Sequence, residues 1–281
     1  MPCAVSTLLV LLDGDGRCDA RTQLAAGLAA RQGSHLVGIA PTGLVELPPG
    51  FAASRAIADA AASRAEAIRR ADELAARFRR RCADEGAESV EAHVHEGDKA
   101  AVLLHHALCA DLVVIGQADP AVAAHREQER FVEDVVLRNP RPTLVVPHAG
   151  RVHGVGQSVL IAWDDSPGCA RAVSDALPLL KDARQVHLRL WHRPGEGDEA
   201  LISDRLHGVR AWLMRQGVAA DVGVVATRMP IGEAILQSAA DGGADLVVMG
   251  TYGHSRWTER LLGGVSRTAL ARSPVPLLMS H

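Results

Sequence analysis

A seven-residue segment occurs twice in this chain, and the repeat restricts the folds that the chain can adopt. Residues 110–116 read ADLVVIG and residues 244–250 read ADLVVMG, so six of seven positions are identical at a spacing of 134 residues. The same spacing relates residues 142–146 to residues 276–280, PTLVV and PLLMS. A repeat of this length predicts two copies of one domain, which we expect to span residues 1–148 and 149–281.

The two copies differ by an insertion in the first one. An apolar segment that ends in Asp13 resembles one that ends in Asp164, but these two segments lie 151 residues apart. This spacing is 17 residues longer than the 134-residue spacing of the later segments. The first copy therefore carries an insertion, which we expect within residues 42–87. That region has a proline-rich start and then a long pattern of Ala, Arg and Glu over 52–84, which is typical of a helix with a solvated face.

The second half alternates between apolar runs and helical periodicity. The expected strands lie near 158–163, 185–191, 220–227, 244–249 and 275–279, and the expected helices cover 169–180, 201–216 and 232–240. The chain has three Phe, four Trp and one Tyr, so its core must be mainly aliphatic. These patterns predict an α/β protein of two tandem Rossmann-like domains, each a five-stranded parallel sheet with helices on both faces.

A glycine-rich segment follows the fourth strand of the second half. Gly250 and Gly253 come directly after that strand, and Gly263-Gly264-Val265-Ser266 comes at the expected start of a helix. Glycines let backbone N–H groups approach a phosphate, and the first turn of a helix supplies unpaired donors. Asp164 ends the first strand, so it is expected at the same crevice, where the carboxyl ends of the strands meet. Glycines that only form turns remain the alternative.

With these residues the chain resembles the universal stress protein family. The first strand of that family ends in Asp, usually within Val-Asp-Gly-Ser, and Asp164-Asp165-Ser166 matches this motif except that Asp165 replaces Gly. The nucleotide-binding branch of the family carries Gly-x2-Gly-x9-Gly-(Ser/Thr), and Gly250, Gly253 and Gly263 match its spacing. The resemblance is specific in the second half and weaker in the first half.

The resemblance implies a site for ATP, alone or with Mg²⁺, or for another adenine nucleotide. By this analogy Asp164 meets the adenine or the ribose, the backbone at Leu190 flanks the base, and Met249 lies under the nucleotide. The residues implied around the nucleotide and its phosphates are Asp164, Leu190, Met249, Gly250, Gly253, His254, Gly263, Gly264, Val265 and Ser266. Gly264 stands where the family has Ser or Thr, and His254 stands at a frequently basic position.

The first half lacks this pattern. At the 134-residue spacing, Gly253, Gly263, Gly264 and Ser266 correspond to Asp119, Glu129, Arg130 and Val132. Acidic side chains at phosphate-facing positions repel the ligand. We therefore expect the first half to be a degenerate partner that completes a pseudo-dimer within the chain, and whether two chains also form a homodimer stays open.

Composition excludes several classes of protein. The formal net charge of −3 disfavours a general nucleic-acid binder. No apolar run is long enough to span a membrane, and the first residues do not read as a secretion signal. Five cysteines without a CxxC pair are expected to be reduced thiols in the cytoplasm. His93-x-His95 and His105-His106 offer metal ligands, but no third ligand is evident nearby, so no metal site is expected.

Three functional hypotheses follow. We favour a nucleotide sensor of the stress response, in which the bound state controls an unknown protein partner. The alternatives are a nucleotide-free interaction scaffold and a slow ATP hydrolase. His254, Ser255 and Glu259 lie near the glycines but form no recognisable triad, and no Walker-type lysine follows them, so efficient turnover is not expected. Arg267 is at most an auxiliary phosphate partner.

Overall fold

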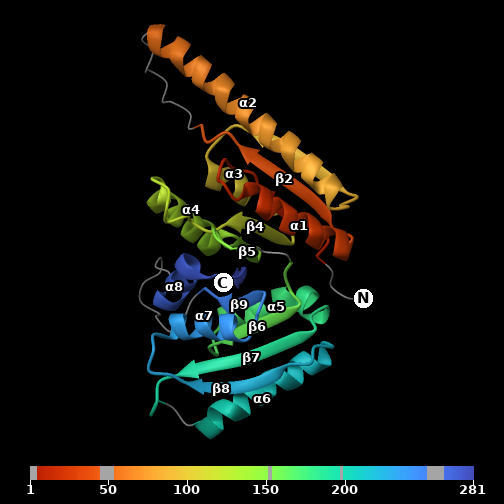
Figure 1. Ribbon diagram of the computed structural model, residues 1–281, viewed down its shortest axis with the longest axis vertical. Coiled ribbons are helices and arrows are strands. Elements are labelled where there is room, and N and C mark those ends of the chain that lie inside the picture. Colours follow the sequence, from red (N-terminus) through yellow and green to blue (C-terminus); the bar gives the residue numbers. More distant parts are fainter. Residues whose placement is uncertain (1–4, 45–53, 151–153, 197–198, 252–262) are drawn as a thin grey trace. The chain divides into compact units, whose positions relative to one another are not determined.

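The computed structural model describes residues 5–44, 54–150, 154–196, 199–251 and 263–281 (Figure 1). Its contacts divide the chain into two compact units, Val5–Val114 and Ile115–His281, called below the N-terminal and the C-terminal unit. Both units consist of helices and of strands that are parallel except for β5, in agreement with the predicted α/β class.

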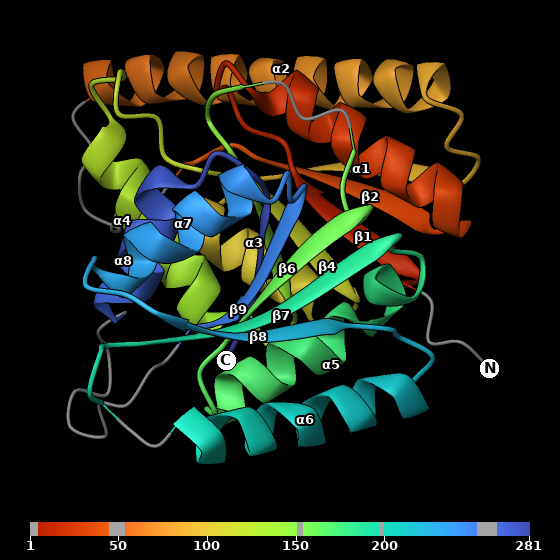
Figure 2. The ribbon, with the colours of Figure 1, turned by 60° about the horizontal axis from the view of Figure 1, so that its bottom comes forward.

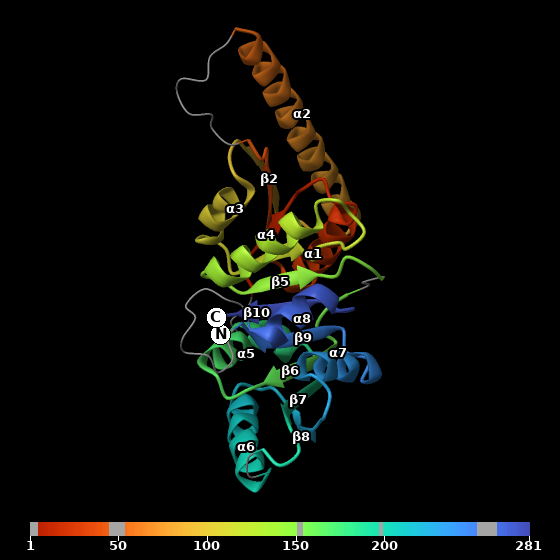
Figure 3. The same cartoon turned by 90° about the vertical axis from the view of Figure 1, so that its left-hand side faces the viewer.

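The N-terminal unit has a sheet of parallel strands in the order β3-β2-β1-β4. Its elements are β1 (Thr7–Leu11), α1 (Cys18–Gln32), β2 (His35–Pro41), α2 (Ser54–Asp84), β3 (Val90–His95), α3 (Lys99–Ala107) and β4 (Leu112–Gly116), the last of which crosses the boundary between the units. Figure 3 shows α2 on one side of β2 and α3 on the other. The predicted helix at 52–84 is therefore confirmed as α2, and residues 45–53 before it lie outside the described residues.

The C-terminal unit has its strands in the order β5-β10-β9-β6-β7-β8. Its elements are α4 (His125–Arg138), β5 (Thr143–Val146), β6 (Ser158–Trp163), α5 (Pro167–Lys181), β7 (Gln185–His192), α6 (Glu199–Arg215), β8 (Asp221–Ala226), α7 (Ile231–Asp241), β9 (Leu246–Gly250), α8 (Gly264–Arg272) and β10 (Leu277–Ser280). Figure 2 shows α5 and α6 on one face of these strands and α7 and α8 on the other. All the strands and helices predicted for the second half are present.

The closing strands of the two repeats pair with each other. β10 runs parallel to β9 and antiparallel to β5, with Leu277 opposite Val145 and Met279 opposite Thr143. This pairing joins α4 and β5 of the first repeat to the second repeat. The boundary between the compact units therefore lies within β4. The boundary between the two sequence repeats, expected at residue 148, stays a prediction.

The repeated Ala-Asp-Leu-Val-Val segment is explained by its aspartate. In the N-terminal unit, Asp111 Oδ2 accepts hydrogen bonds of 3.0 Å from the backbone N–H groups of Ser6 and Thr7, at the start of β1. In the C-terminal unit, Asp245 Oδ1 accepts from Gly156 (2.9 Å) and Ser158 (3.2 Å), at the start of β6. Each aspartate ties the loop before the fourth strand of its repeat to the start of the first strand of that repeat. The aspartate of the repeat therefore positions the sheet, at the opposite end of the fourth strand from the predicted crevice.

Candidate functional site

A cavity of about 430 Å³ lies at the carboxyl ends of β6, β7 and β9. Eight of the ten predicted site residues line it: Asp164, Leu190, Met249, Gly250, Gly263, Gly264, Val265 and Ser266. The other two, Gly253 and His254, lie outside the described residues, as do Ser255 and Glu259. The structure therefore brings the predicted residues that it describes to one place, and their binding of a nucleotide stays a prediction.

Asp164 forms the turn that leaves β6. Its Oδ1 accepts a 3.0 Å hydrogen bond from the Ser166 backbone N–H, and the Ser166 hydroxyl in turn accepts a 3.0 Å bond from the N–H of Cys169. Ser166 is thus the N-cap of α5, with Pro167 as its first residue. Because Ser166 caps the helix, the Asp164 carboxylate is not needed as the cap and borders the cavity.

Asp165, which replaces the family's glycine, has a left-handed backbone. Its φ of 59° makes it the one non-glycine residue with positive φ among the described residues, and aspartate adopts this conformation more readily than most side chains. Its carboxylate accepts a 2.7 Å hydrogen bond from Trp163 Nε1 and pairs with Arg205 Nη1 on α6 at 2.9 Å. The replacement therefore adds a charged bridge at the edge of the cavity.

Gly250 is required by the fold. A Cβ at this position would lie 2.5 Å from the backbone nitrogen of Cys169 and 2.8 Å from the carbonyl carbon of Gly168. The end of β9 thus packs directly on the first turn of α5, and only glycine permits this approach. The predicted glycine motif accordingly includes one residue whose identity needs no ligand to explain it. Burial also raises the pKa of the neighbouring Cys169 thiol to about 12, so this cysteine is not a candidate nucleophile.

Gly263 and Gly264 contrast with Gly250. A Cβ at either position would meet no described atom within 4 Å. Gly263 is the N-cap of α8 with φ −62° and ψ 155°, a conformation open to any residue, and no described side chain caps this helix. The first backbone N–H groups of α8 therefore lack intrahelical partners. Together with the positive end of the helix dipole, they make the cavity wall suited to an anion.

The Ser266 side chain has a partner within the protein. Ser266 is buried, and its hydroxyl donates a 3.2 Å hydrogen bond to the Thr251 carbonyl. The resemblance implies a phosphate contact through this hydroxyl, whereas in the structure the hydroxyl joins α8 to Thr251, the residue after β9. The backbone N–H groups of α8 are then the donors that a phosphate can reach without breaking an existing side-chain bond.

Part of the cavity wall is apolar. Leu190 and Met249, which the sequence analysis predicted, are buried there. Ile202, Ile231 and Ile235, which it missed, extend this surface from α6 and α7. Ala162, Trp163, Trp191 and Arg205 also line the cavity. Helical periodicity places Ile202 and Ile235 on the inner faces of their helices, but it does not distinguish a side chain that faces a cavity from one that packs in the core.

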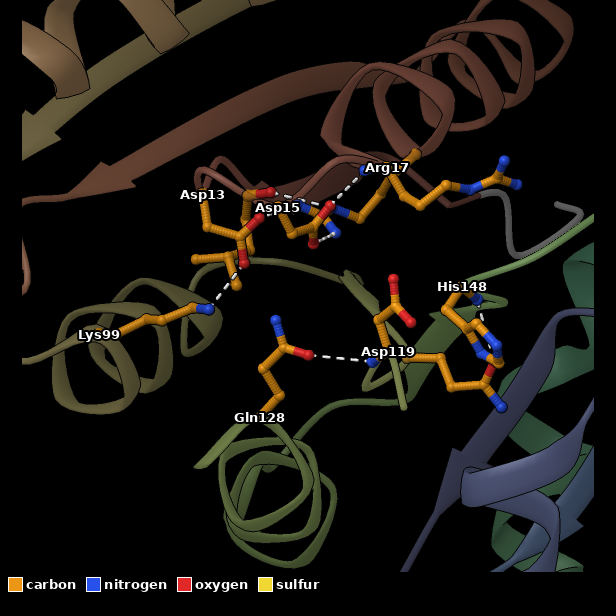
Figure 4. A network of polar contacts seen from close by, with 10 residues as sticks. Asp13, Asp15, Arg17, Lys99, Asp119, Gln128 and His148 are labelled. Carbon is orange, nitrogen blue, oxygen red and sulfur yellow. Dashed lines mark hydrogen bonds and ion pairs between the residues drawn. The ribbon is translucent and has the colours of Figure 1, made fainter. Parts of the chain in front are cut away.

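At the end of β1 in the N-terminal unit, cations of the protein surround the aspartate that corresponds to Asp164. Arg21 is fully buried and pairs through Nη2 with Asp13 (2.5 Å) and through Nη1 with Asp15 (2.7 Å), while Lys99 Nζ lies 2.7 Å from Asp13 (Figure 4). Burial alone would raise the pKa of Asp13, but Arg21 and Lys99 hold this pKa well below its usual range. The first repeat thus neutralises internally the carboxylate that the second repeat leaves at the cavity.

The other first-repeat positions also differ from those of the second repeat. Asp119 lies before α4, where its N–H donates to Gln128 Oε1 at 2.9 Å (Figure 4). Glu129, the counterpart of Gly263, lies inside α4 and is 3.2 Å from His125 Nε2. Because α4 begins at His125, the first repeat has no helix start at the position that corresponds to α8. That the first half lacks a phosphate site stays a prediction.

The histidine cluster of the N-terminal unit has no metal-ligand geometry. The ring centroids of His95 and His106 are 4.4 Å apart, and those of His105 and His106 are 5.5 Å apart. Burial and the neighbouring imidazoles lower the pKa of His106. Within the described residues, no group of three or more His, Cys, Asp or Glu side chains is arranged to hold a metal ion.

Two further predictions concern charged and apolar segments. Arg267, on α8, lies 3.3 Å from Glu133 of α4, so its guanidinium has a partner within the C-terminal unit. Among the described residues, no helix combines the length and the apolar character that crossing a membrane requires.

The comparisons with known proteins agree on one family. Residues 157–281 match the Universal stress protein family. Universal stress protein Slr1230 of Synechocystis is 24% identical over 171 residues, which cover 60% of this chain and 57% of that protein. The chain thus spans less than two thirds of that relative.

Two solved structures resemble the whole chain. A universal stress protein from Archaeoglobus fulgidus superposes with a TM-score of 0.71 at 17% identity, covering 98% of this chain and 95% of that one. A functionally unknown protein from Pseudomonas aeruginosa gives 0.61 at 18% identity, covering 99% and 92%. At these identities the likeness concerns the fold.

Proposed function

We propose that residues 157–281, which match the Universal stress protein family, bind ATP or another adenine nucleotide in the cavity at the ends of β6, β7 and β9. The observation that carries the proposal is the pair Gly263 and Gly264. Packing against described atoms does not require either glycine, and both line the cavity at the start of α8, where no described side chain caps the helix. Close approach of a ligand's phosphates is a physical reason for glycine at both positions.

The apolar side of the cavity suits an adenine ring. Its volume of about 430 Å³ is in the range typical of small-molecule sites. Leu190, Met249 and Ile235 provide flat aliphatic contact, and Asp164 provides an acceptor for a ribose hydroxyl or the adenine amino group. In this arrangement the nucleotide lies with its base toward β7 and its phosphates toward α8.

We expect ATP to bind alone or with its own Mg²⁺ and to be hydrolysed slowly or not at all. Arg267, the nearest arginine along the chain after the glycines, is paired with Glu133, so stabilisation of a transition state by its charge would require that pair to break. Asp164 already accepts a bond from the Ser166 N–H through one oxygen. A binding protein fits these residues better than an efficient hydrolase.

We propose that the bound nucleotide acts on a protein partner through α8. The Gln117 side chain, buried at the end of β4, donates through Nε2 to the Leu270 carbonyl of α8 at 2.8 Å, and its Oε1 accepts the His148 N–H at 2.9 Å, next to β5. A ligand that fixes the first turn of α8 therefore acts on a helix whose last turn is held by the first repeat. The closing strands β5 and β10 are the route to the surface where a partner would respond.

A role in the stress response and a location in the cytoplasm complete the proposal. The family name supports the first of these. The four cysteines of the described residues, Cys18, Cys82, Cys109 and Cys169, are all free thiols, which supports a reducing compartment.

Replacing Gly263 by valine tests the site. The Gly263→Val side chain enters the cavity, so ATP affinity measured by calorimetry should fall at least about tenfold, equivalent to ~1.4 kcal/mol. The matched control is Gly14→Val, because a Cβ at Gly14 likewise meets no described atom within 4 Å but lies in the repeat without the motif. Equal ATP affinity in the parent and in a folded Gly263→Val variant would show that the phosphates do not bind here and would favour a nucleotide-free scaffold.

A further inference from the structure

A second cavity, of about 500 Å³, lies between α5 and α6. It shares Trp163 and Arg205 with the first cavity, and its other walls come from the two helices. None of the glycines at the start of α8 lines it. The second cavity therefore adjoins the first at Trp163 and Arg205 but lacks the glycines that carry the proposed nucleotide site.

Tryptophan is concentrated at this cavity. The chain has four Trp in 281 residues and 3% aromatic residues overall, yet Trp163 and Trp212 both line this one space. Both are neither fully buried nor fully exposed. Tryptophan rings that are left partly open in a concave site provide large apolar faces for stacking with a planar ligand.

Gly208 lines the same cavity from the interior of α6. Glycine is less favourable than alanine within a helix because it loses more backbone entropy on folding. A Cβ at Gly208 would meet no described atom within 4 Å, so packing does not require the glycine. Gly208 is exposed, and its lack of a side chain leaves space on the α6 side of the cavity, which gives the residue a role if that space is occupied.

The charged side chain at this cavity is a cation, Arg205. Among the described residues that line it, Arg205 is the one charged residue, and none is acidic. The Arg205 side chain is 50% exposed and uses Nη1 for its ion pair with Asp165. Within the described residues its remaining guanidinium donors make no hydrogen bond, so an anionic group can bind there.

We propose that the cavity between α5 and α6 binds a planar aromatic anion, such as an aryl carboxylate or sulfonate. The ring packs against Trp163 and Trp212 in the space left by Gly208, and the anionic group meets the Arg205 guanidinium. Asp165 supports this site from the side, because its carboxylate holds both Trp163 Nε1 and Arg205 Nη1.

The test is calorimetric titration of the full chain with 2-naphthoate. Saturable binding with one site per chain is expected, and the uncharged 2-naphthamide should bind at least about tenfold more weakly because it lacks the anion. Gly208→Leu fills the cavity with a good helix former and should weaken 2-naphthoate binding at least about tenfold. Ala211→Leu is the matched control, since Ala211 is exposed on α6 and lines neither cavity; it should change the affinity less than about twofold.

Three results would overturn the proposal: no saturable binding of 2-naphthoate at millimolar concentration, equal affinity for 2-naphthamide, or unchanged affinity in a folded Gly208→Leu variant. Trp212→Ala is a second variant for the case in which Gly208→Leu does not fold, and it should also lose at least about tenfold in affinity. ATP titrated into the same variants separates this site from the nucleotide site, because Gly208 and Trp212 do not line the nucleotide cavity.

Discussion

Substituting Gly250 by alanine should destabilise the C-terminal unit without any ligand. The new Cβ would lie 2.5 Å from the Cys169 nitrogen, about 0.9 Å closer than the 3.4 Å at which ordinary contact begins. The atoms in conflict belong to the backbone of α5 and β9, so no side chain can move away to relieve the contact. Overpacking of this kind costs ~1–3 kcal/mol, and the rigid surroundings place Gly250→Ala at the upper end, at ~2–3 kcal/mol.

The control for this substitution is Gly264→Ala, in the same glycine motif. Its Cβ meets no described atom within 4 Å, and it lies at the start of α8, where alanine is at least as favourable as glycine. Urea unfolding followed by circular dichroism should give a lower midpoint for Gly250→Ala. The free energy of unfolding of Gly264→Ala should equal that of the parent, or exceed it by less than ~1 kcal/mol. Equal midpoints for Gly250→Ala and the parent would refute the assignment of Gly250 to packing.

Three further predictions concern charges and caps. Asp13→Asn leaves the Arg21 cation buried beside one carboxylate, so the free energy of unfolding in urea should fall by ~3–5 kcal/mol. The pKa of Asp13 is lower in the folded state, so its stabilisation is complete above the ordinary pKa of 3.8 and is lost as pH falls through the folded value. The pKa of Asp15 is raised in the folded state, so its contribution to the free energy of unfolding changes with pH in the opposite direction. The parent should therefore lose stability below pH ~5 more steeply than Asp13→Asn, and parallel curves would contradict this assignment. Asp165→Gly removes the left-handed strain together with the bridge to Arg205, whereas Asp165→Ala keeps the strain; thermal unfolding should show Asp165→Ala as the less stable by ~1 kcal/mol. Ser166→Ala removes the cap of α5 and should cost ~1 kcal/mol in the same assay, while Ser174→Ala, on the exposed face of α5, should cost less.

The sequence predicted the fold well because its signals are local and repeated. Buried parallel strands such as β6 and β9 are continuous apolar runs, and the repeated segment fixes how the elements of the two halves correspond. The sequence predicted that the two halves form a pseudo-dimer, but it did not predict the register between β5 and β10. That register depends on contacts between residues far apart in the chain.

The candidate site was predictable where residues stand at recognisable positions along the chain. Gly263, Gly264 and Asp164 were predicted from the glycine spacing and from their places after apolar strands. The sequence could not show that Gly250 serves packing, that Ser266 bonds to Thr251, or that Arg205 reaches Asp165. Each of these depends on side chains or backbone atoms that the fold brings together from separate elements.

The central claim is that the C-terminal repeat holds an adenine nucleotide. The most direct measurement is to denature the purified chain, identify any released nucleotide by chromatography and mass spectrometry, and titrate the emptied protein with ATP. Our account predicts an adenine nucleotide in the released fraction or, failing that, ATP binding to the emptied protein with micromolar affinity. Absence of nucleotide together with no binding at millimolar ATP would contradict it, and the chain would then be an interaction scaffold.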